Sequence, residues 1–124
     1  MKSTKFAALT LFLACAVGTA YAHHSGATYD STKMVTVKGT VKEFEWSNPH
    51  AWLNVVVLNP SGQAEDWAFE MASPLQLTSH GWKKDTLKAG DQITIQAHPL
   101  KDGSHGGSYM SVTLPTGQVL GQRG

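Results

Sequence analysis

From residue 34 onward, hydrophobic and polar residues alternate along the chain in short segments with the period of β-strands. Val35, Val37 and Val41 share one face of the first segment, and threonine and lysine residues occupy the other face. The phase of this alternation changes before Phe44, and either Gly39 or a bulge near Glu43 could bend the strand there. The pattern therefore predicts a long first strand with a bend in it.

Four later segments also have the length and composition of β-strands. One of them, residues 51–58, is apolar on both faces, as is typical of a central strand. Between the third and fourth strands, Ser73 and Pro74 have the residue types of a helix N-cap and a first helical position, and Gly81 would end the helix. The four segments are residues 51–58, 66–72, 92–98 and 108–114.

The expected order of elements is three strands, one helix and two strands, which is the order found in the OB-fold. We therefore predict an all-β fold with one short helix, a small five-stranded OB-like barrel formed by residues 34–124. Residues 23–33 are polar and contain glycine. They are predicted to form an extended N-terminal arm.

Residues 1–22 have the features of a secretory signal peptide. Lys2 and Lys5 precede a short apolar run, and an Ala-x-Ala sequence ends at Ala22. We expect cleavage after Ala22 and a periplasmic protein. Stable membrane insertion is not expected, because the run is shorter than the ~20 residues that a spanning helix needs. The alternative is lipidation at Cys15, although the residues before it make a poor lipobox.

Cleavage after Ala22 would leave 102 of the 124 residues, the size of one domain. It would remove two of the ten Lys and Arg residues, leaving eight against nine Asp and Glu. Nucleic acid is not an expected partner, because its recognition needs a basic surface. Cleavage would also remove the only cysteine, and with it any thiolate ligand or disulfide.

The mature chain would begin with two of the six histidines. The α-amine and imidazole of His23 can chelate one metal ion, and His24 offers an amine, amide and imidazole set. Nitrogen ligands without thiolates favour copper(II). This start resembles that of histidine-brace copper proteins, in which an N-terminal histidine joins a second one, although those proteins are usually sandwiches. The other interpretation is that the pair merely follows the cleavage site.

The segment EWSNPHAWLNV, residues 45–55, concentrates polar and aromatic residues at the turn between the first two strands. Trp46, Asn48, His50 and Trp52 would converge at the mouth of the barrel, where a ligand site is common. In the alternative interpretation, Asn48 only shapes the turn and the tryptophans fill the end of the barrel.

Glu70 lies between apolar neighbours on the third strand. If its side chain is buried, it needs a partner, because an unpaired buried carboxylate is costly. In that case it could bind His50 or orient a metal ligand. If its face points to solvent, Glu70 is an ordinary surface residue.

Several motifs together resemble a family of small exported bacterial proteins catalogued as a domain of unknown function. These motifs are the His-His-Ser start, the Trp-x-Asn-Pro-His turn, the Trp-x-x-Glu strand and the Lys-Asp-Gly-Ser loop. His105 stands where this family would have another residue. The resemblance implies no activity. It implies family positions for His23, His24, Trp46, Asn48, Pro49, His50, Trp67, Glu70, Gly81 and Trp82.

The sequence leaves two main hypotheses for function. The first is a periplasmic copper carrier or buffer that uses His23 with His24 or His50 and performs no turnover. The second is a metal-free module that binds a small apolar or aromatic ligand, or an unidentified protein partner, around Trp46, His50 and Trp52. A metal-dependent enzyme is a lesser alternative, because no catalytic fingerprint is present in the sequence.

Overall fold

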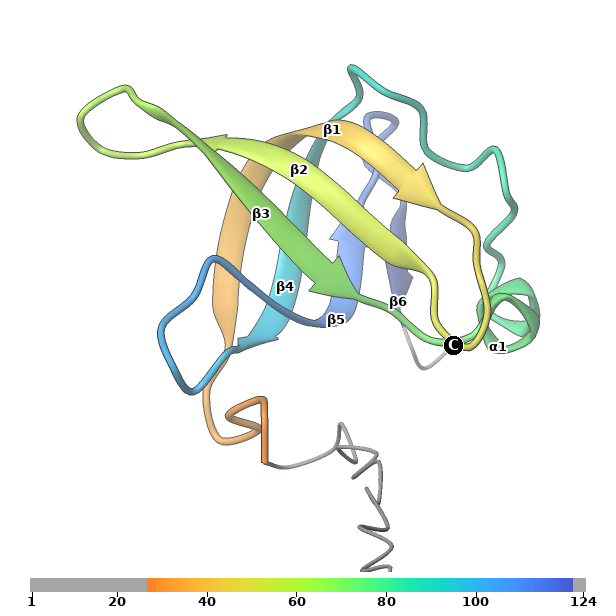
Figure 1. The fold of residues 1–124 in the computed structure, drawn as a ribbon. Coiled ribbons are helices and arrows are strands. Elements are labelled where there is room, and N and C mark those ends of the chain that lie inside the picture. Colours follow the sequence, from red (N-terminus) through yellow and green to blue (C-terminus); the bar gives the residue numbers. More distant parts are fainter. Residues whose placement is uncertain (1–26, 122–124) are drawn as a thin grey trace, which may run out of the picture.

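The computed structural model describes residues 27–121, which form a closed five-stranded mixed β-barrel with one short helix (Figure 1). The predicted fold class is confirmed. The predicted signal peptide, Cys15, His23 and His24 lie outside the described residues. The elements are β1 (Val35–Glu45), β2 (Trp52–Leu58), β3 (Ala64–Glu70), α1 (Pro74–Ser79), β4 (Gln92–Pro99), β5 (Gly106–Thr113) and β6 (Val119–Gly121).

The barrel strands follow the order β3-β2-β1-β4-β5 with antiparallel neighbours, and a parallel pairing of β3 with β5 closes the ring. This closure requires glycine. A β-carbon on Gly106 would overlap the carbonyl oxygen of Ala68, and one on Gly107 would overlap that of His98. Closing the sheet also pairs backbone groups that an open edge would leave exposed. The sixth strand, β6, is short and pairs only with β5.

The alternating residues of the barrel strands build its core, as their pattern predicts. The register of β1 against β2 shifts between Val41 and Glu43, which confirms the bulge. The two largest fully buried side chains are Trp82 and Tyr109. The indole Nε1–H of Trp82 donates to the Tyr109 hydroxyl at 2.9 Å, so the polar atoms of both rings are satisfied inside the core.

Helix α1 begins where the sequence predicts. The Ser73 hydroxyl accepts a hydrogen bond from the backbone N–H of Gln76 at 3.3 Å, and Pro74 occupies the first turn. Leu77 is the buried residue of this helix. Within residues 27–121, no helix has the length and apolar character of a membrane span.

The described part of the N-terminal arm packs against the end of β4 (Figure 1). Tyr29 forms an isolated bridge with Leu100. The backbone N–H of Asp30 donates to Pro99 at 2.9 Å, and that of Lys101 donates to Thr28 at 3.0 Å. Residues 28–30 are therefore fixed to the barrel by backbone hydrogen bonds on both sides of Tyr29.

Candidate functional site

The turn between β1 and β2 carries His50 to the end of β3. The pairing of β2 with β3 continues past the ends of these strands. The backbone N–H of Ala51 donates to the carbonyl of Ala72 at 3.0 Å, and the carbonyl of Ala51 accepts from the N–H of Met71 at 2.9 Å. The Ser47 hydroxyl donates to the carbonyl of His50 at 3.0 Å. These bonds hold the backbone on both sides of the His50 side chain.

The hydrogen bond of the His50 ring fixes its tautomer. Its Nδ1 lies 2.7 Å from the carbonyl oxygen of Met71. A carbonyl can only accept, so Nδ1 carries the proton, and in the neutral ring Nε2 keeps a lone pair. The side chain is 43% exposed. Metal-binding histidines commonly have this arrangement, with one ring nitrogen donating to the backbone and the other directed to the ion.

Glu70 is the one charged side chain in the buried part of the described barrel, and it is only 8% exposed. The Tyr29 hydroxyl donates to its Oε2 at 2.6 Å. Its Oε1 lies 3.7 Å from Nδ1 of His50, which is ion-pair range when the ring is protonated. Burial, the hydrogen bond to Glu70 and the charge of Glu70 raise the pKa of Tyr29 well above its usual range.

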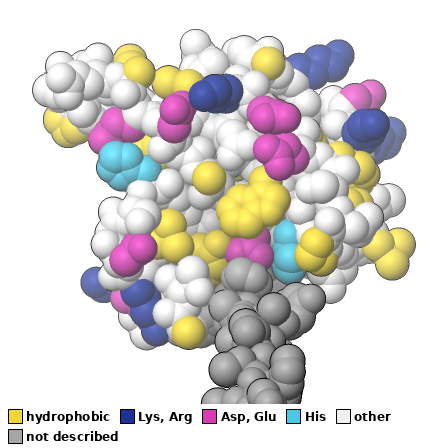
Figure 2. Space-filling view, in the orientation of Figure 1, with side chains coloured by type: hydrophobic (Ala, Val, Ile, Leu, Met, Phe, Trp, Pro, Cys, Tyr) yellow, Lys and Arg dark blue, Asp and Glu magenta, His cyan; other side chains and the backbone are white. Residues whose placement is uncertain are grey.

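Trp52 lies directly opposite Glu70 in the register of β2 and β3, and opposite Glu45 on β1. Side chains at such opposed positions share a face of the sheet and come into contact. Figure 2 shows histidine, acidic and hydrophobic side chains adjoining on this face. We call His50, Glu70, Tyr29 and Trp52 together the His50 site.

Trp46 and Asn48 are the remaining two residues of the cluster that the sequence predicts on this turn. Trp46 packs edge-on against Phe44, with ring centroids 5.7 Å apart, and is partly buried against the core. Asn48 is exposed, and its peptide bond to Pro49 is cis. Among the described residues, no group of three or more His, Cys, Asp or Glu side chains is arranged to hold a metal ion. A metal at the His50 site would therefore need further ligands.

A second histidine environment lies near the start of β5. The His105 ring stacks on Trp67, with centroids 5.0 Å apart and planes 6° from parallel. Its Nε2 lies 3.2 Å from Oε2 of Glu65. Both rings border a pocket of about 250 Å³ that Lys42 and Asp66 also line. The indole N–H of Trp67 is buried, and the structure gives it no hydrogen-bond partner within residues 27–121.

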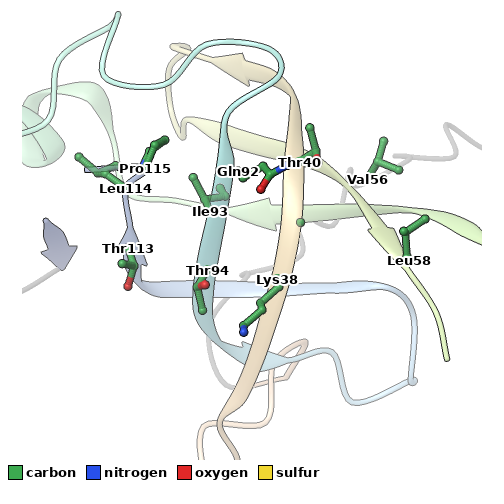
Figure 3. Close-up of a pocket in the computed structure, with 11 residues that line it drawn as sticks. Lys38, Thr40, Val56, Leu58, Gln92, Ile93, Thr94, Thr113, Leu114 and Pro115 are labelled. Carbon is green, nitrogen blue, oxygen red and sulfur yellow. The ribbon is translucent and has the colours of Figure 1, made fainter. Parts of the chain in front are cut away.

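A larger groove lies on another part of the barrel, across the outer side of β2, β1, β4 and β5 (Figure 3). Its volume is about 660 Å³. Lys38, Thr94 and Thr113 supply polar groups, while Leu58 and Pro115 are apolar. It shares no lining residue with the His50 site, and it contains a single charged side chain.

Tyr29 is the member of the His50 site that sequence reasoning missed. It stands 41 positions before Glu70, in a segment without periodicity. Its neighbours Thr28 and Asp30 are typical of a loop, so no local signal distinguishes it from an exposed arm residue. Glu70, in contrast, could be selected because it interrupts an apolar strand.

A family model described as a family of unknown function, DUF6152, matches residues 9–109. The chain belongs to this family. Neither the comparison with curated proteins nor that with solved structures finds a match. Membership therefore brings no activity to the His50 site, and its chemistry has to be argued from the residues themselves.

Proposed function

We propose that this protein binds copper(II) in the periplasm as a carrier or buffer, with the mature N-terminal residues His23 and His24 completing a site at His50. The observation that supports this most directly is the fixed tautomer of His50. Because Nδ1 donates to Met71 at 2.7 Å, the lone pair of the neutral ring lies on Nε2. One ligand is thus oriented before the ion arrives.

Charge and ligand type support the same assignment. Glu70 places a carboxylate within 3.7 Å of the His50 ring, and its negative charge favours a cation nearby. An α-amine and imidazoles form a nitrogen-rich, thiolate-free set, which favours copper(II) among divalent first-row metals. No step of turnover is part of the proposal.

The decisive experiment is a copper(II) titration of protein that begins at His23, measured by competition with a chelator of known affinity. The same titration is made on a version with one added N-terminal Gly and on His50→Ala. His105→Ala is the matched control, because it also removes one half-exposed histidine, at 48% side-chain exposure against 43% for His50.

Tight one-to-one binding that weakens in both the extended protein and His50→Ala, but not in His105→Ala, would support the proposal. Loss in the extended protein alone would contradict the role of His50, because a terminal chelate would then account for all the binding. Absence of tight binding in every version would reject copper as the ligand.

The mature N-terminus needs its own test. Intact mass spectrometry of the exported protein should give the mass of residues 23–124. A lipid-modified chain beginning at Cys15 would contradict the proposal, because His23 would then have no free α-amine to offer.

The alternative function, a metal-free module for an apolar or aromatic ligand or a protein partner, has support from one observation. Trp52 is half-buried on the same face as Glu70. An aromatic surface beside a carboxylate can bind a small ligand without a metal. Quenching of tryptophan fluorescence by such a ligand, lost in Trp52→Ala and indifferent to an added N-terminal Gly, would favour this function over copper binding.

A further inference from the structure

We propose that the outer face of β1, β2 and β3 binds a linear aliphatic diamine, with one ammonium group at each end of a row of three side chains. The row consists of Glu45, Trp52 and Glu70, and we call it the Trp52 row. Its ligand needs no metal ion, and all three residues belong to the described part of the chain. The site therefore goes beyond the proposed function.

The register of the sheet places an indole ring between two carboxylates. Trp52 on β2 lies opposite Glu45 on β1 and opposite Glu70 on β3. Side chains at opposed positions share one face of the sheet, so the three form one row across it. Because neighbouring strands lie about 4.8 Å apart, the two carboxylates start from backbones separated by about 10 Å. In Figure 2, acidic side chains lie on opposite sides of a hydrophobic one over these strands.

Glu70 is the member of the row that most needs a positively charged partner. It is only 8% exposed, and a buried carboxylate is costly unless hydrogen bonds or an opposite charge compensate it. The Tyr29 hydroxyl donates to its Oε2 at 2.6 Å, but Oε1 has no hydrogen-bond donor within residues 27–121. The 3.7 Å from Oε1 to Nδ1 of His50 is too long for a hydrogen bond, and that nitrogen donates to Met71. One oxygen of Glu70 is thus left for an ammonium group.

The β1 end of the row is also acidic. Glu45 accepts a hydrogen bond from the side-chain amide of Asn54 at 3.0 Å, which holds it beside β2. Glu43 lies opposite Asn54 and adds a second carboxylate to this end. Lys42, its neighbour in sequence, pairs with Asp66 at 3.3 Å instead. Both ends of the row are therefore complementary in charge to a ligand with two positive ends.

Trp52 supplies the surface between the two charged ends, and it is half-buried. Among aromatic side chains, tryptophan attracts a nearby cation most strongly. The methylene chain of a diamine can also bury apolar surface against the indole ring. A ligand with one positive charge would reach one carboxylate only, and a compact inorganic ion would not span the ring. The row therefore favours a diamine with a chain long enough to cross Trp52.

A hollow beside the row leaves room for such a ligand. The next three opposed residues, Glu43, Asn54 and Ala68, line the pocket of about 250 Å³. Ala68 carries only a methyl group, so the surface is lower there than at the Trp52 ring. An ammonium group at Glu45 can therefore enter from the side of Glu43 without displacing the indole.

The test titrates metal-free protein that begins at His23 with four probes and measures each affinity by calorimetry. The probes are hexamethylenediamine, trimethylenediamine, hexylamine and hexanediol. Hexamethylenediamine should bind at least about tenfold more tightly than hexylamine, because its second ammonium adds a hydrogen bond between charged groups. Trimethylenediamine is too short to span the row and should bind no better than hexylamine. Hexanediol, which has no charge, should show no binding.

Variants assign the two ends of the ligand. Glu45→Gln and Glu70→Gln should each reduce the affinity for hexamethylenediamine to that for hexylamine, and Trp52→Leu should weaken the binding of both. Glu65→Gln is the matched control, because Glu65 is also on β3 but five positions from Glu70, on the opposite face. In about 0.1 M salt, a charge this far away is largely screened, so the affinity should change by less than about twofold.

The results separate this site from the alternatives. Equal binding of hexylamine and hexamethylenediamine, or weakening by Glu70→Gln but not by Glu45→Gln, would overturn a site with two ends. Absence of diamine binding would reject the ligand class. Glu45 is partly exposed, so Glu45→Gln remains informative if thermal melts show that Glu70→Gln is unfolded. An added N-terminal Gly should leave the diamine affinity unchanged, whereas it should weaken copper binding, so either proposal can fail without the other.

Discussion

His50 and His105 are exposed to a similar degree, yet their surroundings give the two rings different chemistry. His50 donates from Nδ1 to a backbone carbonyl at 2.7 Å and leaves Nε2 without a protein partner within the described residues. His105 has its Nε2 3.2 Å from Glu65, and one face of its ring is covered by Trp67. The first arrangement leaves one ring nitrogen of His50 available, whereas the second engages both the outer nitrogen and one face of the His105 ring.

The type of partner explains this difference. A backbone carbonyl fixes one tautomer and does not move, so the opposite nitrogen of His50 remains available. A carboxylate and an aromatic ring instead occupy both the outer nitrogen and one face of His105. Exposure alone therefore does not distinguish the two rings, whereas the hydrogen-bond partner of each ring nitrogen does.

The largest expected effect lies on the His105 side, where the barrel closes. Gly106→Ala should lower the free energy of unfolding by about 3 kcal/mol or more. The new β-carbon would overlap the Ala68 carbonyl at a residue whose φ is 154°. Urea denaturation measures the change. Gly103→Ala is the control, because no atom lies near its β-carbon position and only the strain of a φ of 79° remains, about 1 kcal/mol.

The next effect concerns alkaline pH on the His50 side. Burial and Glu70 raise the pKa of Tyr29 above its ordinary 10.0. Burial raises the pKa of Tyr109, in the core, to about 12. A group whose pKa is higher in the folded state stabilises the protein fully below its unfolded pKa. That stability is lost as pH rises through the folded value.

The melting temperature should therefore begin to fall near pH 10 and fall further through pH 12, by on the order of 5 °C. The melting temperature of Tyr29→Phe should fall less over this pH range than that of the wild-type protein, whereas that of His105→Ala should fall by the same amount. An identical alkaline loss in Tyr29→Phe would contradict the contribution of Tyr29.

A smaller effect should separate the two histidines directly. His105→Ala should lower the free energy of unfolding by about 1 kcal/mol, because it removes the stack on Trp67 and a partly exposed contact with Glu65. Its copper affinity should remain unchanged. His50→Ala should weaken copper binding instead. Equal copper affinities in the two variants would mean that the two histidines do not differ in copper binding.

The smallest effect is expected at Lys42, beside the Trp67 and His105 pocket. Its Nζ lies 3.3 Å from Asp66, and both side chains are largely exposed. Lys42→Ala should change the free energy of unfolding by no more than about 0.5 kcal/mol, and added salt should reduce even that. Chemical denaturation at low and high salt measures this change in the free energy of unfolding. A change larger than this would mean that Lys42 stabilises the pocket.

Parts of the candidate site were accessible from the sequence and parts were not. His50 and Glu70 could be selected because each departs from its surroundings, one in a polar turn and one within an apolar strand. The sequence does not decide whether Trp46 and His50 converge, since turn residues close in sequence can face different directions. The structure packs Trp46 against Phe44 and the core.

The sequence by itself determined the five strands of the barrel and the capped start of α1, and it indicated an irregularity in β1 at Gly39 or Glu43. These features depend on interactions between residues that are close along the chain, so alternation and capping residues reveal them. Tertiary structure alone decided the closure of β3 on β5, the stack of His105 on Trp67 and the bond from Tyr29 to Glu70. Each of these joins residues dozens of positions apart. Only the path of the folded chain decides which distant side chains meet.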